Sequence, residues 1–246
     1  MILSQISEPV GRAKRWLTSL PDKLPTRCPL CLMPSVGGHL CEGCEADFFW
    51  QRQQRPTCNR CANDQTDTGS CQRCLPEGSV DAMACALDYA FAGQLLITRY
   101  KQLGQLALAR LLARLMAKAA QPLLQVYQPI VWIPIPASTQ RLMHTGFSPA
   151  QQLARLVAEQ TAIPSSLDWL SQHDPLAPQK TLGRVARARA VDGRFFAAEL
   201  PVGCTVGLID DVVTTGSTLS AAARALKQAG AGQVVAIVAA RTPLGA

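Results

Sequence analysis

One stretch of the sequence decides the fold: Val206-Gly207-Leu208-Ile209-Asp210-Asp211-Val212-Val213-Thr214-Thr215-Gly216-Ser217-Thr218. Its uninterrupted apolar start, residues 206–209, predicts a buried strand that delivers two adjacent carboxylates to its carboxyl end. Hydroxyl side chains around one glycine follow, and the apolar spacing of a helix comes next. Ligands of open parallel sheets bind at this edge, so the stretch predicts a parallel α/β fold together with its ligand site.

The sequence on both sides of this stretch repeats the alternation of strand and helix. An amphipathic helix that ends at Gly230 and an apolar strand over 233–239 complete a strand–helix–strand unit of about 30 residues. Upstream, strands are predicted over 82–90 and 130–135, and a helix over 95–120 with an interruption near Gly104. Ser148 and Pro149 open a further helix as cap and first residue. Such alternation predicts a parallel sheet that is covered by helices on both faces.

The hydroxyl-rich loop favours a phosphorylated ligand. Backbone amides of the loop and of the helix N-terminus suit a phosphate, and Thr214, Thr215, Ser217 and Thr218 add hydroxyl donors. Gly216 lets the backbone approach the ligand closely. The two carboxylates suit the diol of a ribose or its magnesium ion. The alternative is a plain polar loop with a threonine cap, but such a loop does not require two adjacent like charges.

Eight of the ten cysteines form an internal repeat. The spacing C-x2-C, nine residues, C-x2-C occurs twice, thirty positions apart, in Cys28, Cys31, Cys41, Cys44 and in Cys58, Cys61, Cys71, Cys74. Two such knuckles complete the four-sulfur shell of a structural zinc ion, so the repeat predicts two zinc ions. The ions are held within each repeat or in an interleaved arrangement between the repeats. Disulfides and an iron–sulfur cluster are the weaker alternatives.

Composition predicts a globular protein of the cytoplasm. Hydrophobic residues make up 48% and charged residues 17%, and no apolar stretch reaches the ~18 residues that membrane insertion needs. No signal peptide is evident at the N-terminus. Three regions are predicted: an amphipathic segment over 1–24, a double zinc-ribbon module over 25–80 and the sheet domain over 81–246. The net charge of +7 favours polyanionic partners only mildly.

The segment from Ile209 to Thr218 resembles the phosphoribosyl-pyrophosphate motif of type I phosphoribosyltransferases. With the preceding cysteine knuckles, residues 28–241 resemble the ComF family of competence proteins, which includes GntX-type proteins. The resemblance implies an α/β, parallel-sheet, type I phosphoribosyltransferase-like domain behind a small cysteine-rich module. It also implies a link to DNA uptake or use.

The resemblance implies a role for each residue of the motif. Asp210 and Asp211 would hold the ribose hydroxyls and act in catalysis, and Val212 through Thr218 would hold the 5-phosphate of phosphoribosyl pyrophosphate with Mg²⁺. Lys101 matches a lysine that the family tends to carry, and it either faces the pyrophosphate or lies on a solvated helix face. The family's Arg-Gly-Phe-Asn-Gln segment is Thr145-Gly146-Phe147-Ser148-Pro149 here, which loses the arginine and both amides.

Two functions are compatible with these patterns. The first is a phosphoribosyltransferase whose acceptor the sequence does not identify. The second is a non-catalytic adaptor that senses a phosphoribosyl ligand and docks single-stranded DNA or a DNA-handling partner such as a helicase of DNA uptake. A basic segment from Lys180 to Arg194 either contacts such a strand or forms a solvated charged face.

Overall fold

The computed structural model of the protein describes residues 24–53, 55–65, 71, 74–103, 106–172 and 195–243. The chain divides into two compact units between Trp50 and Gln51. The amphipathic segment predicted over 1–24 falls almost wholly outside the described residues, and so does the basic segment from Lys180 to Arg194.

The first unit is small, and its described residues, from 24 onward, form little apolar core. Strands β1 (Pro25–Arg27) and β2 (Pro34–Val36) pair antiparallel, and helix α2 (Glu42–Gln53) follows them across the unit boundary. Among the side chains that the structure describes in this unit, only Cys28 and Leu40 are buried. Burial of one aliphatic side chain does not fold a module of this size, so its stability must come from another source.

The second unit is built on a four-stranded sheet in the order β3-β8-β7-β4. Its strands are β3 (Ala82–Asp88), β4 (Trp132–Pro134), β7 (Thr205–Val213) and β8 (Gln233–Arg241). All three neighbouring pairs are parallel, which confirms the predicted α/β class with a parallel sheet. The strand with the acidic pair, β7, is an inner strand between β8 and β4.

A glycine in β7 makes room for the largest side chain of the core. Trp132 is fully buried, and its strand position pairs with Gly207. A Cβ atom at Gly207 would overlap the Trp132 ring, so the close packing of β4 on β7 requires glycine at this place.

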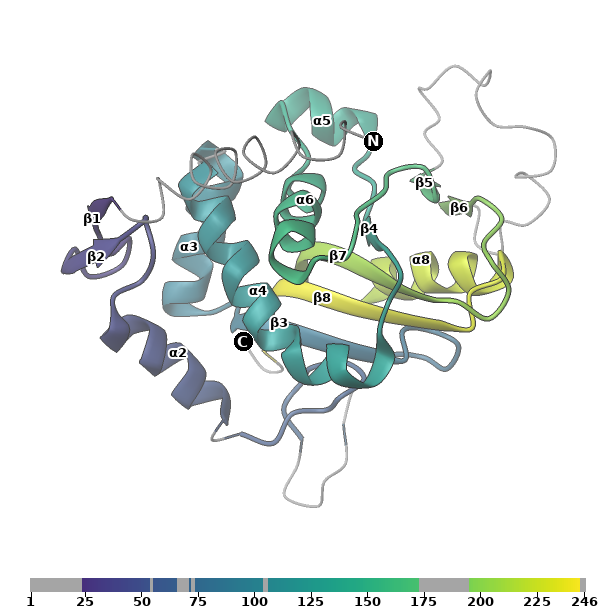
Figure 1. The fold of residues 1–246 in the computed structure, drawn as a ribbon, viewed down its shortest axis with the longest axis horizontal. Coiled ribbons are helices and arrows are strands. Elements are labelled where there is room, and N and C mark those ends of the chain that lie inside the picture. The colour runs from purple at the N-terminus through teal and green to yellow at the C-terminus, as the bar shows by residue number, and fades with distance from the viewer. Residues whose placement is uncertain are drawn as a thin grey trace, which may run out of the picture. The chain divides into compact units, whose positions relative to one another are not determined.

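Helices cover both faces of the sheet (Figure 1). The described helices that lie wholly in this unit are α3 (Phe91–Leu103), α4 (Leu106–Tyr127), α5 (Thr139–Thr145), α6 (Pro149–Thr161) and α8 (Ser217–Gln228). Val206 and Leu208 of β7 share a core with the apolar face of α8, whereas α3, α4 and α6 pack on the opposite face. As predicted, Ser148 caps α6 and Pro149 occupies its first turn. Strands β5 (Leu170–Gln172) and β6 (Phe195–Ala197) form a separate antiparallel pair.

None of the described helices combines the length and the hydropathy that a membrane-spanning helix requires.

Candidate functional site

The acidic pair lies inside β7 and not in the loop after it. The strand continues two residues beyond Asp211, to Val213, and α8 begins at Ser217. Because successive side chains of a strand point to opposite faces, Asp210 and Asp211 diverge. Asp210 is half-buried on the α8 side of the sheet, and Asp211 is buried on the other side with 5% of its surface exposed.

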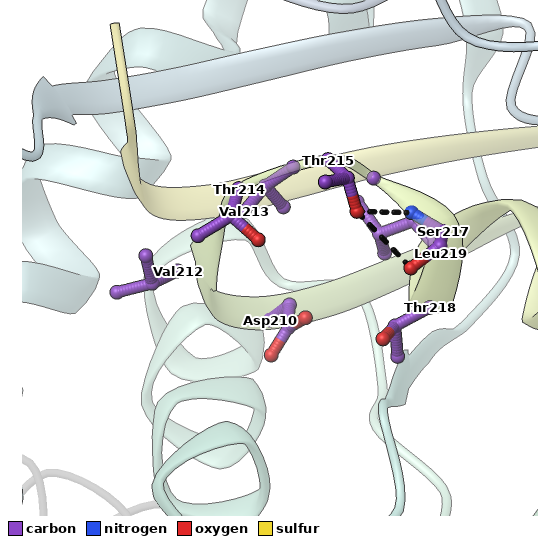
Figure 2. A pocket seen from close by; sticks show the side chains of 9 residues that line it. Asp210, Val212, Val213, Thr214, Thr215, Ser217, Thr218 and Leu219 are labelled. Carbon is purple, nitrogen blue, oxygen red and sulfur yellow. Dashed lines mark hydrogen bonds between the residues drawn. The ribbon is translucent and has the colours of Figure 1, made fainter. Parts of the chain in front are cut away.

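Asp210 and the loop after β7 line a small, solvent-open depression. The lining residues are Asp210, Val212, Val213, Thr214, Thr215, Gly216, Ser217, Thr218 and Leu219. Figure 2 shows the Asp210 carboxylate and the Thr218 hydroxyl on the same side of the loop. Asp210 is therefore the only acidic side chain of the pair that contributes to this depression.

The start of α8 supplies the hydrogen-bond donors of the depression. Gly216 occupies the N-cap position with a left-handed backbone, φ 78°, which favours glycine. The first helical hydrogen bond runs from Ser220 N to Gly216 O at 2.9 Å, so the amides of residues 217–219 have no partner within the helix. Thr215 Oγ1 accepts from Ser217 N at 3.3 Å and holds the turn together (Figure 2). Amides and hydroxyls in this arrangement suit a dianionic phosphate.

On the other face of the sheet, Asp211 forms an ion pair with Lys101 of α3. The distance from Lys101 Nζ to Asp211 Oδ2 is 3.0 Å. The adjacent Tyr100 is fully buried, donates its hydroxyl proton to Pro149 O at 2.9 Å and packs edge-on against Phe147. Burial, together with the Asp211 charge, raises the pKa of Tyr100, which therefore stays a neutral donor. Lys101 was expected to face either a pyrophosphate or solvent, and in the structure its ammonium pairs with the second carboxylate.

We expect an Asp211→Asn substitution to destabilise the fold. It leaves the Lys101 ammonium, whose side chain is 26% exposed, without its counter-charge. The expected loss is about 1–3 kcal/mol of unfolding free energy, less than the ~3–5 kcal/mol for a fully buried pair. Urea unfolding of Asp211→Asn, Lys101→Met and the double variant measures the coupling between the two residues. Additive losses in the double variant would contradict the pairing.

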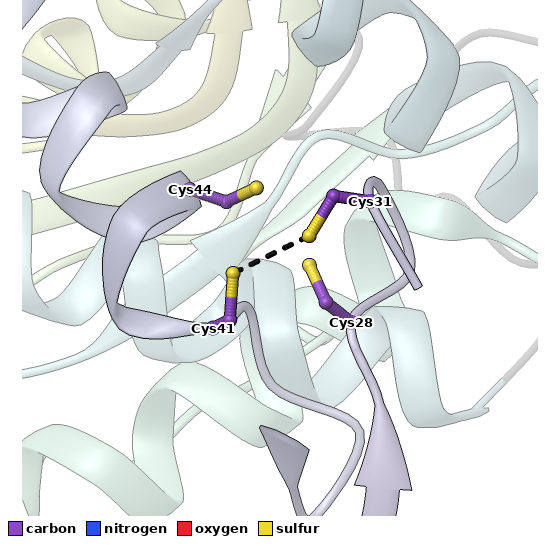
Figure 3. A group of neighbouring side chains, drawn as sticks. All are labelled: Cys28, Cys31, Cys41 and Cys44. Carbon is purple, nitrogen blue, oxygen red and sulfur yellow. Dashed lines mark hydrogen bonds between the residues drawn. The ribbon is translucent and has the colours of Figure 1, made fainter. Parts of the chain in front are cut away.

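The eight repeated cysteines gather into two groups. Within each group all four sulfur atoms lie within 4.8 Å of one another, and the members follow the sequential arrangement, not the interleaved one. Individual Sγ–Sγ distances are 3.4 Å for Cys31–Cys41 and 3.9 Å for Cys58–Cys74. A tetrahedral zinc ion with bonds of ~2.3 Å places its sulfurs ~3.8 Å apart. The two tetracysteine clusters are thus consistent with zinc sites, and Figure 3 shows the first of them.

The two cysteine groups share their backbone conformation as well as their cysteine spacing. In the first group Cys28 N donates to Met33 O, and in the second Cys58 N donates to Asn63 O, both at 2.8 Å. Leu32 and its counterpart thirty positions later, Ala62, both adopt a left-handed backbone. Each C-x2-C segment is therefore the same tight turn, which presents two sulfurs to one point.

Within each group the first thiol is favoured as the thiolate. Burial raises the pKa of Cys28, but hydrogen bonds from the backbone amides of Cys31 and Cys41 outweigh burial and lower it to about 6. The pKa of Cys58 is also lowered, because hydrogen bonds from backbone amides, with that of Arg60 first among them, outweigh its burial. A thiolate is the form that ligates a metal, so amide donors of this kind favour metal binding.

The second cysteine group shares its core with the sheet. Cys58, Cys61 and Leu75 pack in one apolar cluster with residues of β3, β7, β8 and α8. Leu75 also contacts the candidate loop, because a Cβ atom at Gly216 would overlap Leu75 Cδ2. Sequence reasoning did not include Leu75 in the site, and its spacing or type carries no signal for such a contact.

These features define an α/β protein with an acidic strand end and a hydroxyl-rich loop, joined to two tetrathiol groups. No protein-family model matches the chain. The chain is 30% identical over 223 residues to the DNA utilization protein YhgH of Salmonella typhimurium, covering 86% of this chain and 95% of that one. It is 29% identical over 204 residues to the competence protein F of Haemophilus influenzae, covering 79% and 87%. The chain therefore belongs to the family of competence protein F and DNA utilization protein YhgH.

Solved structures give looser matches. The orotate phosphoribosyltransferase of Aeropyrum pernix is matched over 78% of this chain and 90% of that one, with a TM-score of 0.38 and 13% identity. An adenine phosphoribosyltransferase is matched over 57% and 73%, with a TM-score of 0.38 and 11% identity.

Proposed function

We propose that this protein binds phosphoribosyl pyrophosphate with Mg²⁺ in the depression at the end of β7 and acts as a phosphoribosyltransferase-like enzyme. The supporting observation is one pocket that combines the Asp210 carboxylate with the hydroxyls and amides at the start of α8. The 5-phosphate would accept hydrogen bonds from Thr214 through Thr218. Asp210 would accept from the ribose diol or hold the magnesium ion. Asp211 would act indirectly, by fixing Lys101 and the end of the strand.

In such a reaction a nucleophilic atom of the acceptor would bond to the ribose carbon while the bond from that carbon to the pyrophosphate oxygen breaks. Pyrophosphate leaves, and positive charge develops on the ribose during the exchange. Magnesium, when bound, would neutralise the departing pyrophosphate. The contribution of this chain is electrostatic: the negative Asp210 carboxylate near the diol favours the positive ribose, and the loop amides hold the phosphate end still.

We propose zinc as the ion of both tetracysteine clusters, with a structural role, because four thiolates leave no open coordination position. The names of the relatives refer to competence and to DNA utilization, so we place the activity of this chain in DNA uptake or use. The predicted contact with single-stranded DNA or a DNA-handling partner rests on Lys180 to Arg194, which lies outside the described residues.

One observation favours the adaptor function as a second candidate. The described lining of the depression contains no lysine or arginine, and Lys101 is engaged by Asp211. The pocket thus fits the phosphoribosyl half of the ligand better than the pyrophosphate half, as expected of a sensor of phosphoribosyl compounds.

Calorimetry separates the two functions. We expect phosphoribosyl pyrophosphate to bind in the presence of Mg²⁺, to bind more weakly without it, and to bind more tightly than ribose 5-phosphate. Equal affinity for both compounds would favour the adaptor, because the pyrophosphate then contributes nothing. If neither compound binds, the result would contradict a phosphoribosyl site.

A further inference from the structure

The second cysteine group contacts the element that carries the ligand loop through Leu75, the residue after Cys74. Leu75 is buried, with 3% of its surface exposed, and its Cδ2 atom occupies the space beside Gly216. Gly216 is the N-cap of α8 and the centre of the loop. The position of one cysteine ligand is therefore linked, through one side chain, to the backbone that would hold the phosphate.

A second contact runs through a buried arginine. Arg241, the last residue of β8, has 3% of its surface exposed, and its Nε donates to Asn63 Oδ1 at 2.7 Å. Asn63 lies two residues after Cys61 in the knuckle turn. The next residue of the strand end, Thr242, donates its amide to Val213 O at 2.9 Å, directly before the loop.

The charge of Arg241 also suits a metal–thiolate cluster. Burial lowers the pKa of Arg241, whereas negative charge at Cys61, Cys85 and Cys71 acts in the opposite direction. Its Nη1 atom has no hydrogen-bond partner among the described residues. A divalent ion with four thiolates carries a net negative charge. This charge would balance the positive charge of the buried guanidinium beside it, and a buried charge needs such a partner.

The segment after the second group is anchored to the same helix. Ser79 Oγ donates to Ser220 Oγ, in the first turn of α8, at 2.8 Å, and both residues are buried. Asp81 pairs with Lys227 in the last turn of α8 at 2.8 Å. Residues 74–81 thus hold α8 at its start and its end.

The first group carries different residues at the two equivalent positions. Met33 stands where the second group has Asn63, and 60% of its surface is exposed. Glu45 stands where the second group has Leu75. The two repeats share a turn but differ in the residues that face outward from it.

From these contacts we infer that the second tetracysteine cluster holds the ligand loop in place, a role that we call the clamp. Metal occupancy of Cys58, Cys61, Cys71 and Cys74 then controls binding at the site, whereas metal occupancy of the first cluster does not. The inference concerns the ligand site that we propose and rests on that function for its biological meaning. Loss of the second ion releases the Cys71–Cys74 end of the knuckle, and Leu75 and the loop lose their fixed position with it. A displacement of about 1 Å in a group that positions a substrate can cost about a hundredfold in reaction rate.

The repeat supplies a matched pair of variants in the full-length chain. Cys71→Ser with Cys74→Ser removes two ligands of the second group, and Cys41→Ser with Cys44→Ser removes the equivalent two of the first. Each is expected to lose one zinc ion by elemental analysis. Only the second-group variant should show faster hydrogen exchange of the Ser220 amide, which donates to Gly216 O and closes the first turn of α8, in the ligand-free protein. It alone should bind phosphoribosyl pyrophosphate at least about tenfold more weakly.

A second-group variant that lacks its ion but keeps the parental exchange rates would overturn the inference, as would equal effects from both variants. If the parent binds no phosphoribosyl pyrophosphate, the proposed function fails while the exchange rates still decide the clamp. Leu75→Ala guards against a second-group variant that does not fold. It should retain both ions and still accelerate exchange of the Ser220 amide, whereas Leu40→Ala, a buried leucine beside Cys41, should not. Parental exchange in Leu75→Ala would also overturn the inference.

Discussion

An Asp210→Asn variant is expected to bind phosphoribosyl pyrophosphate with Mg²⁺ about a hundredfold more weakly than the parent, because each charge-assisted hydrogen bond is worth about 1.5–3 kcal/mol and a ribose diol offers two. The unfolding free energy should stay nearly constant. Asp210 Oδ1 accepts from Asp211 N at 2.8 Å, and the asparagine oxygen can accept the same bond. Calorimetry and a urea unfolding curve on the same preparation measure both quantities.

Thr215→Val serves as the graded control for that experiment. It removes one hydroxyl and the bond that this hydroxyl accepts from Ser217 N, but it keeps every backbone amide and the Asp210 charge, so its loss of affinity should be smaller. Parental affinity in Asp210→Asn would show that the ligand does not lie beside this carboxylate.

Removal of the metal is expected to abolish the folded structure of residues 24–50. Leu40 is the one aliphatic side chain buried among the described residues of this unit, whereas apparent binding free energies of structural zinc reach about 10–16 kcal/mol. Untreated protein should contain two zinc ions per chain. After chelation, limited proteolysis should cut within residues 24–50, and the Cys41→Ser, Cys44→Ser variant should be cut at the same places without chelator.

One ion per chain, or a brown iron-containing protein, would contradict two structural zinc sites. Resistance of residues 24–50 to protease after complete loss of metal would show that the unit folds by itself.

The parallel sheet and the place of the loop could be predicted because they depend on local patterns. Apolar runs without polar interruption mark strands that are buried on both faces, and they recur where β7 and β8 lie. Gly216 and the hydroxyls around it identify a turn that approaches a ligand. The identical cysteine spacing likewise corresponds to two identical backbone turns.

The sequence analysis did not predict that the two aspartates have different surroundings, although the alternation of side chains along a strand implies it. Adjacent residues of β7 face opposite sides, so only Asp210 reaches the depression once the strand extends to Val213. The extension itself depends on pairing with β8, which reaches Val213, and no pattern local to the acidic pair shows it. The partner of Asp211 is Lys101, 110 positions away, and such a pairing becomes visible only in the fold.

For the same reason, the cysteine spacing could not predict that the two groups have different surroundings. Asn63 and Leu75 are unremarkable in sequence, and their roles arise from Arg241 and Gly216, which lie far along the chain. The repeated spacing predicts what the two cysteine groups share, whereas only the tertiary contacts show how they differ.

The inner position of β7 has a practical consequence for finding the unknown acceptor. The depression is built on a strand that pairs on both sides, so it exists only while the sheet is folded. Any compound that occupies the depression therefore raises the melting temperature of the whole second unit. At a concentration of one hundred times its dissociation constant, a ligand adds about 2.7 kcal/mol to the unfolding free energy. Nucleobases and related small molecules can thus be ranked by thermal shift in the presence of phosphoribosyl pyrophosphate, without any assay of the reaction.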